Sequence, residues 1–192
     1  MAASEDTFAR LVSLAIHDLR TPLATVAGFA RTLQRAQLAD PSGRYLEIMV
    51  AASDQLAELL DDVGLAARIQ DGRWEPNVQE VDALELAHAA AEGLEAAVEG
   101  AGGAVRVDRD AAARSLHLLA RCALRHGGVE RITFAVSGAE VAIAPVTETA
   151  APVLLGVNMR DLGAAVATRV VEALGGSTAL DADRLVVGFP PA

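Results

Sequence analysis

The stretch IHDLRTPLATVAGF, residues 16–29, sets a histidine directly before an acidic residue and five positions before a proline. The chain has only 4 His residues, and this one, His17, stands in an otherwise apolar run with helical periodicity. Such a histidine is either an ordinary surface residue of a helix or a side chain that accepts a phosphoryl group. The rest of the sequence is needed to weigh these two interpretations.

A long first helix is predicted from apolar residues that recur at alternating steps of four and three. These residues are Phe8, Val12, Ala15, Leu19, Pro22, Val26, Phe29 and Leu33. This heptad spacing places them in one seam along a helix. Pro22 removes one backbone hydrogen bond inside the helix and is expected to bend it.

A second helix with the same pattern is predicted to fold back on the first. Its seam residues are Tyr45, Met49, Ala52, Leu56, Leu59, Val63 and Ala66. The intervening AQLADPSGR, residues 36–44, contains the turn formers Asp, Pro, Ser and Gly, which indicates an antiparallel hairpin. Because two broad apolar stripes cannot cover each other completely, we expect a second copy and thus a dimeric four-helix bundle.

His17 is predicted to face water. It lies two residues from Ala15 and two from Leu19, which is a rotation of about 200° on a helix. Thr21 follows on the same side, and Asp18 flanks the ring. Because free imidazole has a pKa of about 6.5, it is a nucleophile at neutral pH. A carboxylate can orient the ring or take its proton, and a hydroxyl can position a water.

The wider sequence resembles a known family. HDLRTPL, residues 17–23, closely resembles the H-box of the histidine-kinase dimerisation and phosphotransfer domain. YLEIMVAASDQLAELLDDVGLAARIQDG, residues 45–72, is similar to the second helix of that domain. The resemblance implies that residues 1–73 form such a domain.

The resemblance also implies a role for each motif residue. His17 would carry the phosphoryl group, and Asp18 would assist its transfer. Thr21 would support dephosphorylation of a partner, and Pro22 would bend the helix. All four positions match the family's motif.

A second domain is predicted over residues 80–192, after a linker that contains Trp74. Its predicted elements are a helix at 81–100, a strand at 104–108, a helix at 110–128, a hairpin of 130–138 with 139–146, a helix at 160–176 and a hairpin at 177–190. This order predicts a two-layer α/β sandwich, and the whole chain is predicted to be α+β.

This half resembles the catalytic and ATP-binding domain of histidine kinases, without that domain's chemistry. Residues 118–128 look like the helix that carries two Asn, and residues 162–177 look like the helix after the second glycine box. Leu118 and Cys122 stand at the Asn positions, although Mg²⁺ needs hard oxygen ligands. The adenine-pocket Asp and glycines are missing from residues 141–152. The resemblance therefore implies a degenerate domain that does not bind ATP.

No metal site and no cofactor-binding residue is predicted elsewhere. The glycine cluster at 100–103 lacks a following Lys and is interpreted as a flexible turn from helix to strand. His88 and His117 have no partner at metal-ligand spacing, and Cys122 is interpreted as a small core residue. Mg²⁺ is expected only in a partner receiver domain.

The amino-acid composition argues against several classes of function. The net charge is −10 and all 16 basic residues are Arg, which argues against a nucleic-acid binder or a polybasic membrane contact. One Cys permits no internal disulfide, and neither a signal peptide nor a membrane span is recognisable. We therefore expect a cytoplasmic protein. Since the motif begins within the first twenty residues, input is expected from a partner.

The predicted function is histidine phosphotransfer between receiver domains of response regulators, through His17 on a homodimer and without ATP. Three alternatives stay open at this point. The protein could be a receiver phosphatase or pseudokinase that depends on Thr21, an atypical sensor histidine kinase, or an interaction protein whose motif is vestigial.

Overall fold

The computed structural model describes residues 2–35, 42–158 and 160–192, and in the first helix it leaves out the side chains of residues 2–11, 13–15 and 18. The chain divides into two compact units, Met1–Trp74 and Glu75–Ala192. Among the described residues, no helix combines the length and the apolar character that crossing a bilayer requires.

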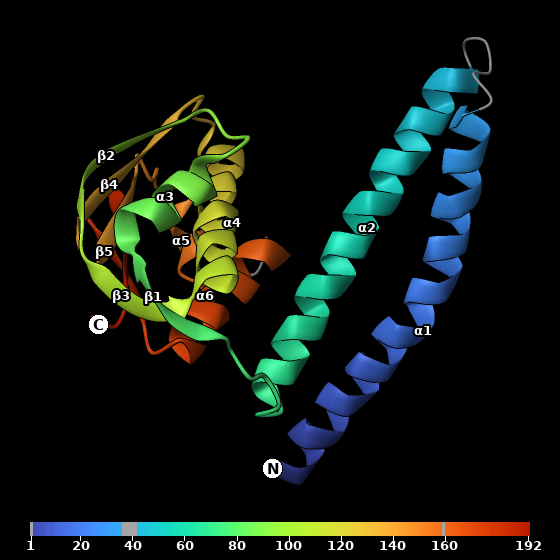
Figure 1. Ribbon diagram of the computed structural model, residues 1–192, viewed down its shortest axis with the longest axis horizontal. Helices are drawn as coiled ribbons and strands as arrows, with labels where there is room; N and C mark the ends of the chain where they lie inside the picture. Colours follow the sequence, from blue (N-terminus) through green and yellow to red (C-terminus); the bar gives the residue numbers. More distant parts are fainter. Residues whose placement is uncertain (1, 36–41, 159) are drawn as a thin grey trace. The chain divides into compact units, whose positions relative to one another are not determined.

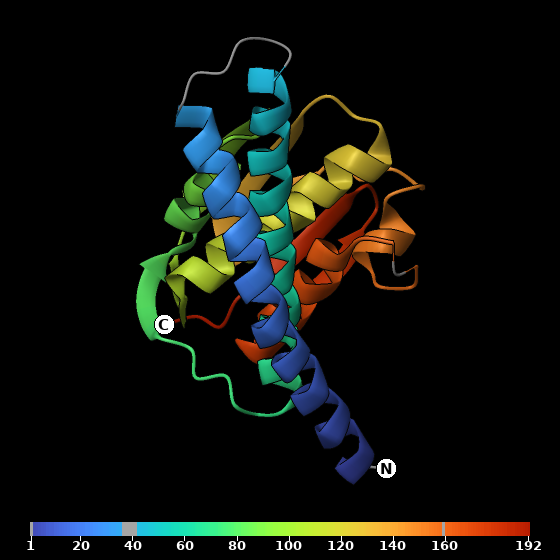
Figure 2. The same ribbon diagram turned by 90° about the vertical axis from the view of Figure 1, so that its right-hand side faces the viewer.

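Two long helices make up the first unit, α1 (Ala2–Arg35) and α2 (Ser42–Gln70). They run side by side in both views (Figure 1, Figure 2), so the predicted helical hairpin is confirmed. Helix α1 continues through Pro22. Part of the predicted loop is helical, because Ser42, Gly43 and Arg44 already belong to α2. Its other residues, 36–41, lie outside the described part of the chain.

The face that α1 and α2 bury against each other is built mainly from small residues. Its buried members include Ile16, Ala27, Ala30, Leu46, Ser53, Gly64 and Ala67. Small side chains allow the two helix backbones to approach closely. Two ion pairs across the hairpin, Arg20 with Asp61 and Arg31 with Asp54, are half exposed and therefore contribute little.

Most of the predicted heptad seam is not buried within one chain. Its exposed members are Leu19, Pro22, Val26, Phe29, Leu33, Tyr45, Met49, Ala52 and Leu56. The seam side chains of Phe8 and Ala15 lie outside the described residues. The seam thus forms an apolar face beside the contact between α1 and α2, because the small residues of that contact lie one helical position away.

In the described part of the second unit there are two sheets and four helices. The larger sheet has the order β2 (Ala96–Gly102), β4 (Ile132–Gly138), β5 (Glu140–Ala144), β7 (Arg184–Gly188) and β6 (Ser177–Asp181), with only β2 and β4 parallel among its pairs. The smaller one pairs β1 (Val78–Asp82) with β3 (Ala104–Asp108) in antiparallel fashion. The helices are α3 (Ala83–Ala91), α4 (Arg109–Gly127), α5 (Ala151–Leu154) and α6 (Leu162–Ala173).

The core of this unit lies between the larger sheet and helices α3, α4 and α6, which cover one of its faces (Figure 1). The central strands alternate in burial with a period of two. Ile132, Phe134, Val141, Ile143, Leu185 and Val187 point into the core. The predicted two-layer sandwich is therefore confirmed, as are its two hairpins, β4–β5 and β6–β7.

Three helices of this unit begin at an aspartate whose side chain accepts a backbone hydrogen bond. Asp82 accepts from Leu84 at the start of α3, over 2.7 Å. Asp108 does the same at the start of α4, and Asp161 does so for α6. Aspartate is among the preferred residues at this position, because the first backbone N–H groups of a helix lack partners within it.

The single helix predicted over residues 81–100 is wrong. Helix α3 ends at Ala91, Gly93 follows with a φ of 74°, and residues 96–102 form strand β2. The Ala- and Glu-rich sequence favours a helix, but parallel pairing with β4 overrides that local preference.

The glycine cluster at 100–103 is not a flexible turn from helix to strand, because most of it belongs to β2. At Gly100 the φ is 103°, and a Cβ would lie 2.0 Å from the carbonyl oxygen of Val136. At Gly102 a Cβ would lie 1.8 Å from Oδ1 of Asp82. The glycines therefore allow a close backbone approach that no larger residue permits.

Candidate functional site

His17 lies on α1 with its side chain exposed, as the periodicity predicts. The residue before it, Ile16, is only 5% exposed and packs against α2. Successive residues of a helix point about 100° apart. The burial of Ile16 therefore turns the imidazole of His17 towards solvent.

Thr21 follows one turn after His17 and is also exposed. Residues four apart share one side of a helix, so the structure brings these two side chains to the same surface. The Thr25 hydroxyl donates to the backbone carbonyl of Thr21 over 3.0 Å. The side chain of Asp18 lies outside the described residues, so its part in the site stays a prediction.

An apolar groove of about 430 Å³ lies on the hairpin. It is lined by Leu19, Pro22, Leu23, Val26, Met49, Ala52, Ser53 and Leu56. Seven of these eight residues are apolar, and several belong to the predicted seam. A continuous apolar surface of this kind marks a site of protein contact.

In the second unit, the two α4 positions that resemble metal-binding Asn positions carry no oxygen ligand. Leu118 is 6% exposed and Cys122 is 1% exposed. Leu118 packs on α6, since a Cβ at Gly163 would lie 3.0 Å from Cδ2 of Leu118. This part of α4 is thus packed against another helix.

The Cys122 thiol is buried, as predicted for a small core residue. Burial raises the pKa of this thiol to about 12. The carboxylate of Asp161 adds to that rise in pKa, and the guanidinium of Arg125 opposes it. The neutral thiol is therefore the form that the folded protein holds at neutral pH.

Three side chains capable of binding a metal meet where α4 faces the start of α6. One ligand atom each from Cys122, His126 and Asp161 lies within 4.8 Å of the others. The sequence did not predict this group. Cys122 and His126 stand four residues apart, which places them on one side of a helix, but Asp161 joins them only in the tertiary structure.

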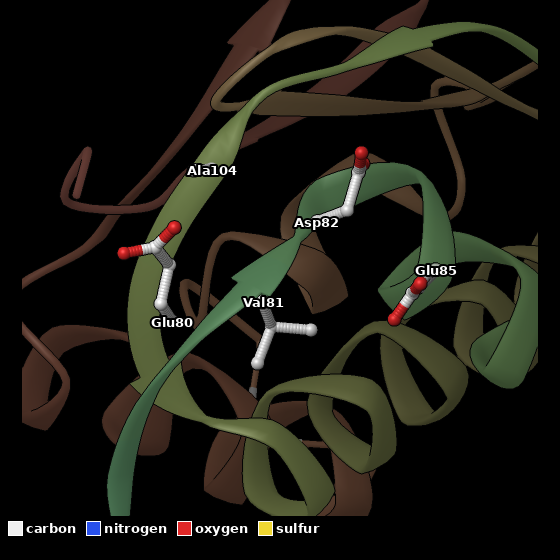
Figure 3. A pocket seen from close by; sticks show the side chains of 5 residues that line it. All are labelled: Glu80, Val81, Asp82, Glu85 and Ala104. Carbon is white, nitrogen blue, oxygen red and sulfur yellow. The ribbon is translucent and has the colours of Figure 1, made fainter.

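A hollow of about 320 Å³ beside β1 has an acidic lining. Glu80, Asp82 and Glu85 line it, together with Val81 and Ala104 (Figure 3). Figure 3 shows the three carboxylates pointing in different directions, and Asp82 already accepts a hydrogen bond from Leu84. This arrangement is a solvated acidic surface and not a convergent set of ligands.

Comparison with known proteins places the hairpin in a defined family. Residues 9–72, which include His17, match the His Kinase A (phospho-acceptor) domain. The sensor protein DivL of Caulobacter vibrioides is 34% identical over 77 residues, which are 40% of this chain and 10% of DivL. The chain thus spans only a tenth of the length of that relative.

Solved structures share the fold of both units. ShkA, crystallised full-length in complex with AMPPNP, has a TM-score of 0.71 at 23% identity, over 95% of this chain and 46% of ShkA. The histidine kinase AdeS of Acinetobacter baumannii has a TM-score of 0.55 at 16% identity, over 91% of this chain and 97% of AdeS. At these identities the likeness concerns the fold alone.

The matched segment contains the exposed histidine, and the fold continues into an α/β unit of the kind found in histidine kinases. The chain is therefore histidine kinase-like, with a match to the His Kinase A (phospho-acceptor) domain at residues 9–72.

Proposed function

We propose that this protein is a histidine phosphotransferase that relays phosphoryl groups between receiver domains of response regulators. A nitrogen of the His17 imidazole attacks the phosphorus of an aspartyl phosphate on the receiver. The bond from phosphorus to the carboxylate oxygen breaks, and the receiver Asp leaves as a carboxylate. A second receiver takes the group from His17 by the reverse of this step.

The exposure of His17 is the observation that carries the proposal. A partner's aspartyl phosphate can reach the ring only if the ring is on the surface, and the burial of Ile16 holds it there. An acyl phosphate is already an activated donor, so the hairpin needs to supply only a positioned nucleophile.

The second unit supports a relay that does not use ATP. Nucleotide-dependent phosphoryl transfer depends on Mg²⁺ and on groups that position the γ-phosphate. Leu118 and Cys122 stand at the α4 positions that would supply amide oxygens, and both are buried. In the proposed reaction, Mg²⁺ belongs to the receiver domain.

A homodimer is part of the proposal. The apolar groove on the hairpin leaves Leu19, Val26 and Leu56 about half exposed in a single chain. A second hairpin of the same kind would cover these residues and complete a four-helix bundle. His17 would stay accessible on the outside, where a receiver can dock.

The test is transfer from a labelled receiver. The protein is mixed with a receiver that carries a radiolabelled aspartyl phosphate, and then with a second receiver. We expect an acid-labile, base-stable label on the protein and then label on the second receiver. His17→Gln should reduce both to background, while His88→Gln, at an exposed histidine of α3, should behave as wild type.

Two outcomes would overturn the proposal. Labelling of His17 from ATP and Mg²⁺ alone would identify an atypical kinase. Loss of receiver phosphate that requires Thr21 and not His17 would identify a phosphatase, which the exposure of Thr21 one turn from the histidine favours as the second candidate. Thr21→Ala and His17→Gln, assayed side by side, separate relay from phosphatase.

A further inference from the structure

We infer that Cys122, His126 and Asp161 form a binding site for one Zn²⁺ ion that joins α4 to the start of α6. All three side chains belong to the second unit, so the site does not include His17. It would act as a structural link within the second unit.

The spacing of the three side chains suits a tetrahedral ion. Their ligand atoms lie within 4.8 Å of one another, and Nε2 of His126 lies 3.3 Å from Oδ2 of Asp161. Zinc bonds of about 2.0–2.3 Å in tetrahedral geometry separate neighbouring ligand atoms by roughly 3.3–3.8 Å. Small side-chain movements would therefore bring all three atoms onto one ion.

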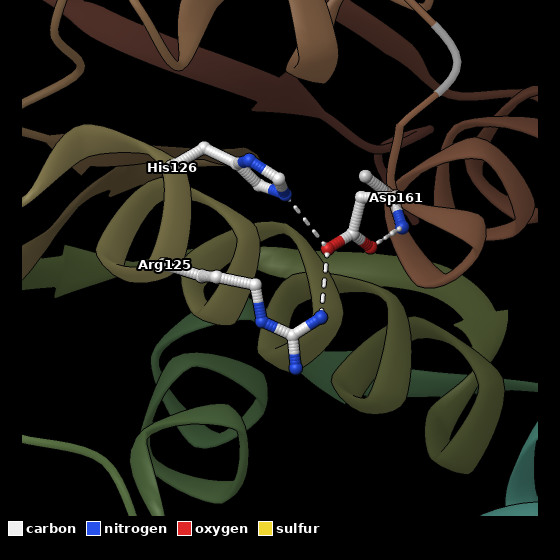
Figure 4. Close-up of polar contacts among 4 residues, drawn as sticks. Arg125, His126 and Asp161 are labelled. Atoms are coloured by element: carbon white, nitrogen blue, oxygen red, sulfur yellow. Dashed lines mark hydrogen bonds and ion pairs between the residues drawn. The ribbon is translucent and has the colours of Figure 1, made fainter.

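The local structure explains why these residues converge. Cys122 and His126 are four apart on α4 and so share one side of that helix. Asp161 begins α6, and its Oδ1 accepts the backbone N–H of Ala164 over 3.0 Å. That hydrogen bond orients the carboxylate and leaves Oδ2 directed at His126, as Figure 4 shows.

Burial also favours a site of this kind. Cys122 is 1% exposed, and the side chains of Asp161 and His126 are 9% and 23% exposed. The thiol and carboxylate are thus largely withdrawn from water, while the imidazole keeps a path to solvent. A water entering along that path can supply the fourth ligand of the ion.

The charges around the site allow the ion to bind. Arg125 lies 3.5 Å from Oδ2 of Asp161, but its side chain is 55% exposed and can turn into solvent (Figure 4). Binding forms a zinc–thiolate bond and releases the thiol proton to the buffer. The donor set of sulfur, nitrogen and oxygen selects Zn²⁺ over Mg²⁺, which prefers oxygen ligands alone.

The site is tested with Co²⁺, a spectroscopic substitute for Zn²⁺, on the 192-residue chain after EDTA has removed bound metal. Cys122 is the only Cys in the chain, so any thiolate-to-cobalt charge-transfer band reports this residue. We expect such a band at one Co²⁺ per chain, with displacement by one Zn²⁺. Cys122→Ser, His126→Gln and Asp161→Asn should each weaken binding by about 10-fold or more.

Asp161→Asn is the decisive variant, because Asn caps a helix about as well as Asp. Circular dichroism should therefore show an intact fold while metal affinity falls. His88→Gln serves as the matched control and should bind normally. The inference is overturned by absence of the charge-transfer band, by unchanged affinity in Asp161→Asn, or by a stoichiometry of one ion per two chains.

Discussion

Ile16 of α1 packs over Gly64 of α2, where a Cβ at Gly64 would lie in van der Waals contact, 3.8 Å from both Cδ1 and Cγ2 of Ile16. This contact lies directly before His17 in the chain. It fixes the rotation of α1 at that point, and the exposure of His17 follows from it.

Replacing Ile16 by alanine should destabilise the hairpin. Ile16 is 5% exposed, and its loss leaves a cavity that the rigid helix pair fills only in part. We expect a loss of about 2–4 kcal/mol in the free energy of unfolding, measured by urea denaturation at a fixed protein concentration. Gln34→Ala, at an exposed position of α1, is the control and should change stability by less than about 0.5 kcal/mol. Equal effects of the two substitutions would contradict the packing described.

Replacing Gly64 by alanine should stabilise the hairpin. The added methyl group would meet Ile16 at ordinary van der Waals distance, and alanine has less freedom in the unfolded chain. We expect a gain of about 0.5–1 kcal/mol by the same denaturation measurement. Gly28→Ala, where nothing lies within 4 Å of the new Cβ, should give a similar gain. A loss at Gly64 with a gain at Gly28 would show that the contact with Ile16 is already tight.

Replacing either of two adjacent alanines of α2 by aspartate tests whether the apolar groove is the dimer interface. Ala52 lines the groove, while Ala51 is exposed and lies about 200° round the helix from Met49. Because neither side chain is buried in a single chain, Ala52→Asp and Ala51→Asp should both fold. We expect Ala52→Asp to be monomeric and Ala51→Asp dimeric, by light scattering after size exclusion. If both variants were dimers, the dimer interface would not lie at this groove.

The Cys122 thiol should react slowly with alkylating reagents. The thiolate is the reactive form, and burial both raises the pKa of this thiol to about 12 and blocks access to it. In EDTA-treated protein at pH 8, we expect iodoacetamide to modify it roughly 100-fold more slowly than in urea. Mass spectrometry of the intact chain follows the single adduct. If Cys122 reacted as fast as a small-molecule thiol in solution, this region of α4 would have to open readily.

The sequence was informative about the hairpin and the exposed histidine. The heptad spacing and the position of His17 relative to it are local properties of a helix, so they could be read without knowing any partner. The same holds for α4 and for the strands β4, β5 and β7, whose buried apolar residues alternate along the chain. The two hairpins and the layered architecture were predicted from the order of these helices and strands along the chain.

Strand β2 could not be predicted in this way. Its residues, AAVEGAG at 96–102, have a composition that favours helix or turn. They form a strand because β4, more than thirty residues later, offers an edge for parallel pairing. Long-range pairing of this kind leaves no periodic signal in the segment itself.

The sequence by itself determined that His17 stands on the exposed side of a long amphipathic helix, since helical periodicity depends only on near neighbours. The tertiary structure decided which apolar residues one chain buries, because the packing of α1 on α2 buries Ile16 against Gly64 and leaves Leu19 half exposed. It also brought Asp161 to Cys122 and His126, since only the packing of α6 on α4 joins residues so far apart in the chain.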